Sequence, residues 1–139
     1  MKNRALMLVP AFVVIAAACG GNVFDLEVGQ CFDDPNSFDE VSDVPIVECV
    51  EPHDNEIYEV FDLPDGDYPG IDSVEETSQQ ACLASFEVFV GSDYATSALD
   101  IGYLYPTSET WRSGDREVVC MVYDLSGSKL TSTVRGSGL

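Results

Sequence analysis

The chain has 139 residues, of which 45% are hydrophobic and 10% aromatic, so it can bury one core but is too short for two comfortable domains. Acidic residues outnumber Lys and Arg by 25 to 6, and the formal net charge is -19 at pH 7. This charge excludes a nucleic-acid partner, because phosphate binding requires a basic surface. The low share of charged residues, 22%, argues against intrinsic disorder.

The first residues have the pattern of a bacterial lipoprotein signal. Lys2 and Arg4 precede an uncharged apolar run over residues 5–18, which ends in small residues directly before Cys19. The run is shorter than the ~20 apolar residues of a membrane-spanning helix. An ordinary secretory peptide is the alternative, but the small residues before a cysteine favour lipidation of the Cys19 thiol by a diacylglyceryl group.

This signal predicts the domain organisation and the location. We expect residues 1–18 to be removed as a signal peptide, residues 19–22 to form the lipidated anchor and a short tether, and residues 23–139 to form one domain. Two acyl chains suffice for stable attachment. The protein is therefore expected on the extracytoplasmic face of the cell membrane, with the membrane as its first partner through the lipid.

The acidity is concentrated in the first part of the domain. No Lys or Arg occurs between Arg4 and Arg112. A solvated outer surface is the simpler interpretation of this pattern, and a cationic or metal-bearing partner is the alternative.

Four cysteines remain once Cys19 is assigned to the lipid: Cys31, Cys49, Cys82 and Cys120. An even number in a small exported chain predicts two disulfides, and four cysteines allow three pairings. We favour Cys31 with Cys49, which would close a short segment between two strands, and Cys82 with Cys120, which would join a helix to a strand. A zinc site is disfavoured because none of the spacings is short.

The predicted elements are strands, one long helix and further strands. Residues 23–32 are predicted as a first strand or an extended entry to the sheet. Apolar alternation and turn residues predict strands over residues 44–49, 56–63, 99–105 and 117–123 and a hairpin arm over residues 129–134. Between them, Ser73 and Glu76 have capping-box spacing, and apolar residues at helical intervals lead to a stop at Gly91. The fold class is therefore α+β, a small antiparallel sheet packed against one long helix.

Several runs resemble the septum formation domain of actinobacterial exported proteins. They are Gly29-Gln30-Cys31-Phe32, the run of residues 47–56 with the spacing C-x-x-P-H-x-x-E, then Cys82, and the run W-x-x-G-D-R-x-x-x-C of residues 111–120. Gln30 stands where that family commonly has Asp, and residues 130–132 lack a glycine often found there. The resemblance implies an envelope protein linked to division septa, and it carries no catalytic residues.

His53, the only histidine, is a candidate site residue. No nucleophile signature accompanies it, so a hydrolase is disfavoured. A metal site on His53, Asp54 and Glu56 is conceivable, but such carboxylates more often cap backbone N–H groups, and we expect His53 to bond a backbone group or a carboxylate and to fix a turn. Calcium binding by residues 62, 65 and 67 is disfavoured because the spacing does not match a calcium loop. No cofactor or metal is expected.

Trp111, Arg112 and Arg116 form the one place where an aromatic residue meets cations. They are candidate binding residues, because Trp and Arg are enriched in interaction hot spots. Burial of Trp111 in the core, with Arg116 paired to Asp115 or to a strand carboxylate, is the alternative. A largely buried Trp111 would refute the hot spot.

The sequence thus predicts a non-catalytic envelope lipoprotein that acts as a binding or scaffolding module, with an envelope or division protein as partner. A receptor for a solute or a cell-wall ligand is the alternative. A flat surface would favour a protein partner, whereas a closed cavity lined by Tyr58, Tyr103 or Tyr105 would favour a ligand.

Overall fold

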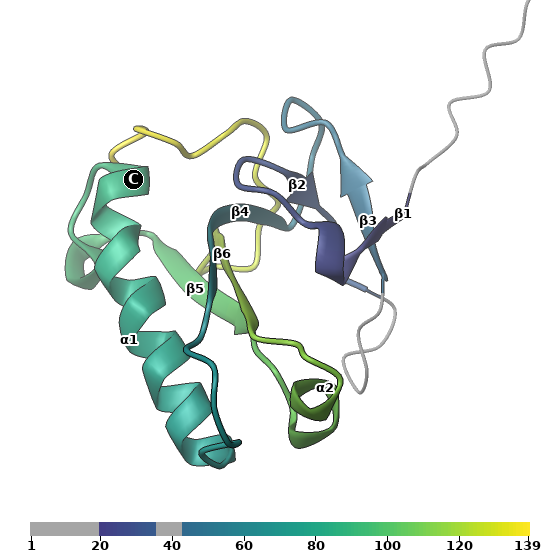
Figure 1. Cartoon of the computed structure of the whole chain (residues 1–139). Coiled ribbons are helices and arrows are strands. Elements are labelled where there is room, and N and C mark those ends of the chain that lie inside the picture. The colour runs from purple at the N-terminus through teal and green to yellow at the C-terminus, as the bar shows by residue number, and fades with distance from the viewer. Residues whose placement is uncertain (1–19, 36–42) are drawn as a thin grey trace, which may run out of the picture.

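The computed structural model describes residues 20–35 and 43–139. One antiparallel sheet has the strand order β1-β3-β2-β4-β6-β5, and the long helix α1 packs against β4 and β5 (Figure 1). The elements are β1 (Gly20–Asn22), η1 (Val23–Asp25), β2 (Cys31–Phe32), β3 (Asp43–Val47), β4 (Asn55–Asp62), α1 (Ile71–Val90), η2 (Tyr94–Thr96), β5 (Leu99–Leu104), α2 (Ser108–Arg112) and β6 (Glu117–Asp124). The predicted α+β class is confirmed.

Alternation along the central strands gives the sheet two apolar faces. In β6, Val118, Cys120 and Val122 pack in the cluster that includes the buried side of α1, whereas Val119 packs in a second cluster with Phe32. Successive side chains of a strand point to opposite faces, so this second cluster lies on the face away from α1. Within the described residues, one face of the sheet is therefore covered by the long helix, and Val23 and Leu26 from the start of the domain pack on the other.

Helix α1 buries one stripe of its surface. Its buried residues recur at intervals of three, four or one: Val74, Ser78, Cys82, Phe86, Phe89 and Val90. The Ser78 hydroxyl donates to the Val74 carbonyl at 2.7 Å, so this buried polar group has a partner. The predicted end is confirmed, since Gly91 has φ 85° and its N–H donates to the Glu87 carbonyl.

Both predicted disulfides are confirmed. Cys31 joins Cys49, 18 residues apart in sequence, and Cys82 joins Cys120, 38 residues apart. The first ties β2 to the turn after β3, and the second ties α1 to β6. Because the second disulfide lies in the apolar cluster between α1 and the sheet, which we call the main core, it fixes the helix on the sheet.

Two sequence predictions about local structure are wrong, and a third, for residues 23–32, holds only in part. Helix α1 begins at Ile71 after Gly70, without a side-chain cap, so Ser73 lies inside the helix. Residues 23–32 form a strand only at Cys31–Phe32, because η1 and a turn with Gly29 at φ 92° interrupt the extended chain. Residues 129–134 do not pair with β6, since β4 and β5 already occupy both sides of that strand.

The C-terminal segment instead closes over the end of the sheet. Leu130 forms an isolated bridge with His53, with backbone hydrogen bonds of 2.9 and 2.8 Å. The chain then runs back to the C-terminal end of α1 (yellow in Figure 1), where Gly136 N–H donates to Phe89 O and Gly138 N–H donates to Val90 O. None of the helices in the described residues has the length and apolar character needed to cross a bilayer.

Candidate binding site

A pocket of about 380 Å³ lies on the face of the sheet opposite α1. Five strands and three connecting segments contribute to it. It is lined by Phe32, Asp34, Pro35, Val44, Asp54, Asn55, Gly102, Tyr103, Leu104, Met121, Tyr123, Asp124, Gly127 and Ser128. Its volume falls within the range of about 300–1,000 Å³ that is common for ligand pockets.

The pocket has an apolar end and an acidic end. Phe32, Val44, Leu104 and Met121 belong to the second apolar cluster or pack against it. Asp34 and Asp54 lie at the other end, which Asp124 also borders.

Gly102 keeps part of the pocket open. It lies opposite Met121 on the neighbouring strand, and a Cβ at this position would come within 3.2 Å of Met121 Cγ. A glycine inside a strand often marks a place where a ligand or another backbone approaches closely. Any larger residue at position 102 would therefore crowd the floor of the pocket.

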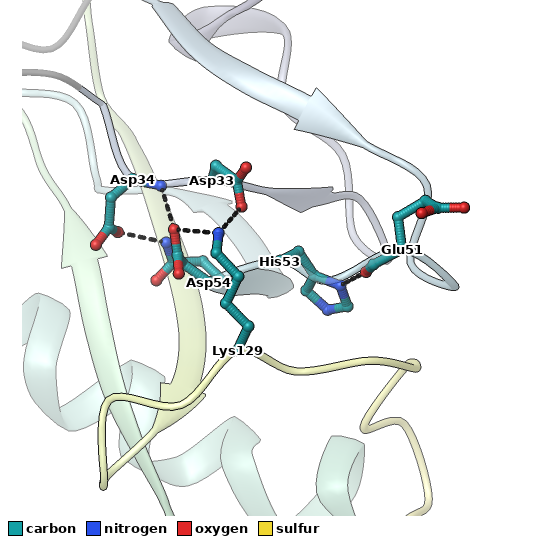
Figure 2. A network of polar contacts seen from close by, with 7 residues as sticks. Asp33, Asp34, Glu51, His53, Asp54 and Lys129 are labelled. Atoms are coloured by element: carbon teal, nitrogen blue, oxygen red, sulfur yellow. Dashed lines mark hydrogen bonds and ion pairs between the residues drawn. The ribbon is translucent and has the colours of Figure 1, made fainter.

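A single lysine neutralises part of the acidic end. Lys129 Nζ lies 2.6 Å from Asp33 Oδ1 and 3.1 Å from Asp54 Oδ2, and Figure 2 shows it between the two carboxylates. Burial raises the pKa of Asp54, but the Asp34 N–H and Lys129 outweigh this and hold the pKa below its usual value. The two carboxylates in turn raise the pKa of Lys129. Both partners of this ion pair are therefore charged at neutral pH.

Asp34 and Asp124 carry charges that no cation of the described residues neutralises. Asp34 Oδ1 accepts a hydrogen bond of 2.8 Å from Asn55 Nδ2, a neutral donor. Hydrogen bonds from the Ser126 hydroxyl and N–H lower the pKa of Asp124. Neither residue forms an ion pair within the described part of the chain. The acidic end thus keeps negative charge after Lys129 is counted.

His53 has the structural role predicted for it. It is fully buried, and its Nδ1 lies 2.7 Å from the Glu51 carbonyl oxygen, to which it donates when that nitrogen is protonated (Figure 2). Its backbone pairs with Leu130 on the C-terminal segment. The neighbouring Asp54 caps a backbone N–H, that of Asp34, at 3.0 Å, as expected for a carboxylate in a turn. His53 therefore fixes the turn before β4.

Glu56, the last residue of the same run, is also buried, with 1% of its surface exposed. Its carboxylate accepts a hydrogen bond of 2.6 Å from Thr133 Oγ1 and another of 2.7 Å from the Val134 N–H. A buried carboxylate needs such partners, because leaving it unpaired is costly. The P-H-x-x-E run thus holds the C-terminal segment at two points near the start of β4, through the His53 backbone and the Glu56 carboxylate.

The hot-spot hypothesis for Trp111 is wrong, because only 6% of this residue is exposed. Its Nε1 donates to the Gly66 carbonyl at 2.9 Å, and the Arg116 guanidinium lies 3.7 Å from the ring centroid. Arg116 pairs with Asp65 rather than with the Asp115 carboxylate, while Arg112 is exposed at the end of α2. The W-x-x-G-D-R run is therefore a clamp that holds the loop before α1 against α2.

The structure does not bring the sequence-based metal candidates together. Within the described residues, the only three-residue group with ligand atoms close enough for one ion is Cys31, Cys49 and Glu56. The two sulfurs are joined in a disulfide, so they offer no thiolates. Cys19, the predicted lipidation site, lies outside the described residues.

The sequence pointed to two residues that line the pocket: Tyr103, as a tyrosine able to line a cavity, and Asp54, as a metal candidate. The Tyr103 side chain packs against the apolar cluster that includes α1. Tyr58 instead lies in the main core, where its hydroxyl donates to the Cys82 carbonyl at 2.8 Å. Most of the lining was missed because it comes from five strands that are separate in sequence. Gly102, a glycine in an otherwise apolar strand, was the available local signal.

The protein is a small antiparallel α+β domain with two disulfides and a pocket on the face of the sheet opposite its long helix. Residues 21–120 match the family model described as septum formation, which covers more than half of the chain. The chain therefore belongs to the septum formation family. Searches among curated proteins and among solved structures found no match.

Proposed function

We propose that this protein is a lipid-anchored, extracytoplasmic binding module that acts in septum formation without catalysing a reaction. The observation that carries a binding role is the pocket, whose walls are supplied by five strands of one sheet. Family membership supports the link to cell division. A rigid pocket with an apolar floor and a few polar groups at one end is the usual form of a recognition site.

The two disulfides support the extracytoplasmic location, because such bonds form and persist in oxidising compartments. The acidic balance of the chain suits a solvated outer domain that is repelled by anionic lipid headgroups. The buried position of His53 supports a non-catalytic role, since its Nδ1 is engaged by the Glu51 carbonyl. The Cys19 lipid would then hold the domain at the membrane.

Two measurements test this proposal. Labelled palmitate is expected to enter the native protein and to be lost in Cys19→Ser, with an unmodified Met1 start as the result that refutes the anchor. A C-terminal fluorescent fusion that folds outside the cytoplasm is expected to concentrate at division sites. Uniform membrane fluorescence through the cell cycle would refute the link to the septum.

A receptor for a small solute is the second candidate function. The volume of about 380 Å³ favours it, because this space would accommodate a small molecule. In that case a solute, rather than a segment of protein, would bind between the apolar and acidic ends.

A further inference from the structure

We propose that the open edge of β5 is a second binding site, at which an extended segment of a partner protein pairs with Tyr103 and lays Lys or Arg side chains against Tyr103 and Tyr105. The two tyrosine side chains pack on the α1 face of the sheet, whereas the pocket lies on the opposite face. This second site goes beyond the proposed function, because it does not depend on the pocket.

β5 presents unpaired backbone groups on its outer side. It is the last strand of the sheet, and no strand of the described residues pairs with that side. The Leu125 N–H donates to the Ala98 carbonyl, so by the alternation of an antiparallel ladder the even-numbered residues bond to the β6 side. The backbone groups of Leu99, Ile101 and Tyr103 therefore face outward.

Only part of this edge is free to pair. The Leu99 N–H donates to Ser97 Oγ at 3.1 Å. The Ile101 N–H donates to Asp100 Oδ1 at 2.8 Å. Within the described residues, the Tyr103 N–H has no such acceptor. The donor that an added strand can use therefore lies in the second half of β5.

Two tyrosine rings beside this donor form an aromatic surface without a cation. Tyr103 and Tyr105 are half-buried against the main core, and their ring centroids are 5.8 Å apart. Neither hydroxyl has a hydrogen-bond partner in the described part of the chain. The guanidinium groups that lie over aromatic rings there cover Trp111 and Phe89 instead. Because the face of a tyrosine ring attracts Lys and Arg, a partner can supply the missing cation.

Charge favours a basic partner over an acidic one and over a second copy of this chain. Burial raises the pKa of Tyr103 and of Tyr105, and the Glu75 carboxylate raises both further, so its negative charge acts at both rings. Glu75 is exposed on α1, and it forms no ion pair within the described residues. A cation over the rings would therefore also be attracted by this carboxylate. Two copies joined at their β5 edges would instead repel each other, since the chain has a net charge of -19.

The alternation of β5 defines the pattern of the partner segment. A residue opposite Tyr103 in an added strand points to the same face, with the two Cβ atoms about 4.5–5.5 Å apart. Its neighbours in the segment point to the other face, beside Gly102 and Leu104, where Leu104 packs against the second apolar cluster. Lys or Arg suits the first kind of position and a β-branched apolar residue suits the second. The expected segment therefore alternates cationic and apolar residues.

The test uses the full chain, purified from native membranes in a neutral detergent, and fluorescence anisotropy with a labelled peptide of sequence Thr-Lys-Val-Lys-Val-Thr. We expect saturable binding that weakens as salt increases. Replacing both lysines with Glu is expected to abolish binding. The reordered peptide Thr-Lys-Lys-Val-Val-Thr has the same composition but mixes the two faces, and is expected to bind at least about fivefold more weakly. No saturable binding at low salt, or equal binding of the reordered peptide, would overturn the proposal.

Matched variants locate the site. Tyr103→Leu combined with Tyr105→Leu keeps apolar side chains on the main core but removes both aromatic faces, and is expected to weaken binding at least about fivefold. Glu75→Gln is expected to weaken it about threefold. Glu87→Gln removes one charge from an exposed position at the other end of α1 and is expected to change affinity less than about 1.5-fold. Equal losses in the two glutamine variants would mean general attraction to an acidic chain and would overturn the proposal, as would unchanged affinity in the tyrosine variant.

Amide hydrogen exchange tests strand addition in the unmodified protein. Saturating peptide is expected to slow exchange at Tyr103 at least about tenfold, and to change it less than about twofold at Ile101, whose N–H is already bonded. Unchanged exchange at Tyr103 would overturn the proposal. Slow exchange there without peptide, together with a dimer in sedimentation, would mean that a second copy occupies the edge and would also overturn it.

A variant at the pocket separates the two sites. Ser128→Trp adds a bulky side chain at the exposed rim of the pocket and is expected to leave peptide binding unchanged. Loss of binding would place the peptide in the pocket and overturn the second site. Palmitate labelling and septal localisation do not depend on this result, so failure of the β5 site is distinguishable from failure of the proposed function.

Discussion

Removing the charge of Glu56 is expected to loosen the C-terminal segment and lower the stability of the whole domain. The Glu56 carboxylate is 1% exposed and accepts hydrogen bonds of 2.6 and 2.7 Å from Thr133 Oγ1 and from the Val134 N–H. A hydrogen bond to a charged group contributes about 1.5–3 kcal/mol, and an unsatisfied buried donor costs about 1–3 kcal/mol. Val134 itself is 2% exposed, so water does not readily replace the lost acceptor.

From these values, Glu56→Gln is expected to lower the free energy of unfolding by about 2 kcal/mol, because one amide group cannot accept both bonds. Glu56→Ala is expected to cost about 3–4 kcal/mol, since it removes both acceptors and leaves a cavity. Thr133→Val removes one donor and is expected to cost about 1 kcal/mol. Against a total stability of about 5–15 kcal/mol, the first two losses are large.

Urea unfolding followed by the fluorescence of Trp111, the single tryptophan, measures these differences. Amide hydrogen exchange at Val134 should accelerate in the Glu56 variants by more than global unfolding explains. Glu76→Gln, on the exposed side of α1, is the matched control and is expected to change stability by less than about 0.5 kcal/mol. If Glu56→Gln and Glu76→Gln have equal stability, the carboxylate does not anchor the C-terminal segment.

Three further predictions follow from the covalent bonds, a carboxylate and the tryptophan. Cys82→Ala with Cys120→Ala is expected to cost about 4 kcal/mol, and removal of the disulfide that closes the shorter loop about 3 kcal/mol, since the entropy effect grows with loop length; the reverse order in urea unfolding would contradict this. The pKa of Asp100 is lowered, first by the hydrogen bond from the Tyr94 hydroxyl and then by those from the Ile101 N–H and the Tyr123 hydroxyl. The ionised Asp100 carboxylate therefore stabilises the fold fully at pH values above its ordinary pKa of 3.8, and this stabilisation is lost as the pH falls through the lower pKa of the folded state. Asp100→Asn should make the free energy of unfolding depend less steeply on pH in the acid range. An unchanged pH dependence would show that other groups dominate. Trp111→Phe loses the bond to Gly66 and should lower the unfolding free energy by about 1–2 kcal/mol, measured by circular dichroism; unchanged stability would contradict the clamp.

The sequence predicted those elements whose cause is local. Apolar residues at helical spacing before Gly91 predicted the long helix and its end, because both the buried face and the left-handed C-cap depend on residues close together in sequence. The disulfide pairing was also predicted, since it joined segments whose strand or helix character was readable. Helix α2 was missed because five residues are too few to show a helical period, although Thr107 supplies its capping box.

The predictions that failed depended on neighbours distant in sequence. Residues 129–134 alternate like a strand, but β6 has no free side, so tertiary structure assigned them to the end of the sheet. Trp111 was ambiguous from composition alone, and only the positions of Gly66 and Arg116 explain its burial. The pocket could not be predicted, because its floor requires the order in which β2, β4, β6 and β5 lie side by side.

The pairing of β4 with β6 has a consequence for how the molecule forms. Ile57 lies opposite Met121, and all of α1 and β5 come between them in the chain. Such distant pairing slows folding, because a long loop must close before the contacts that stabilise it can form. A growing chain therefore presents an unfinished edge of β4 until β6 has emerged, and Glu56 lacks its partners until residue 134 follows. We expect truncated chains that end before this point to aggregate.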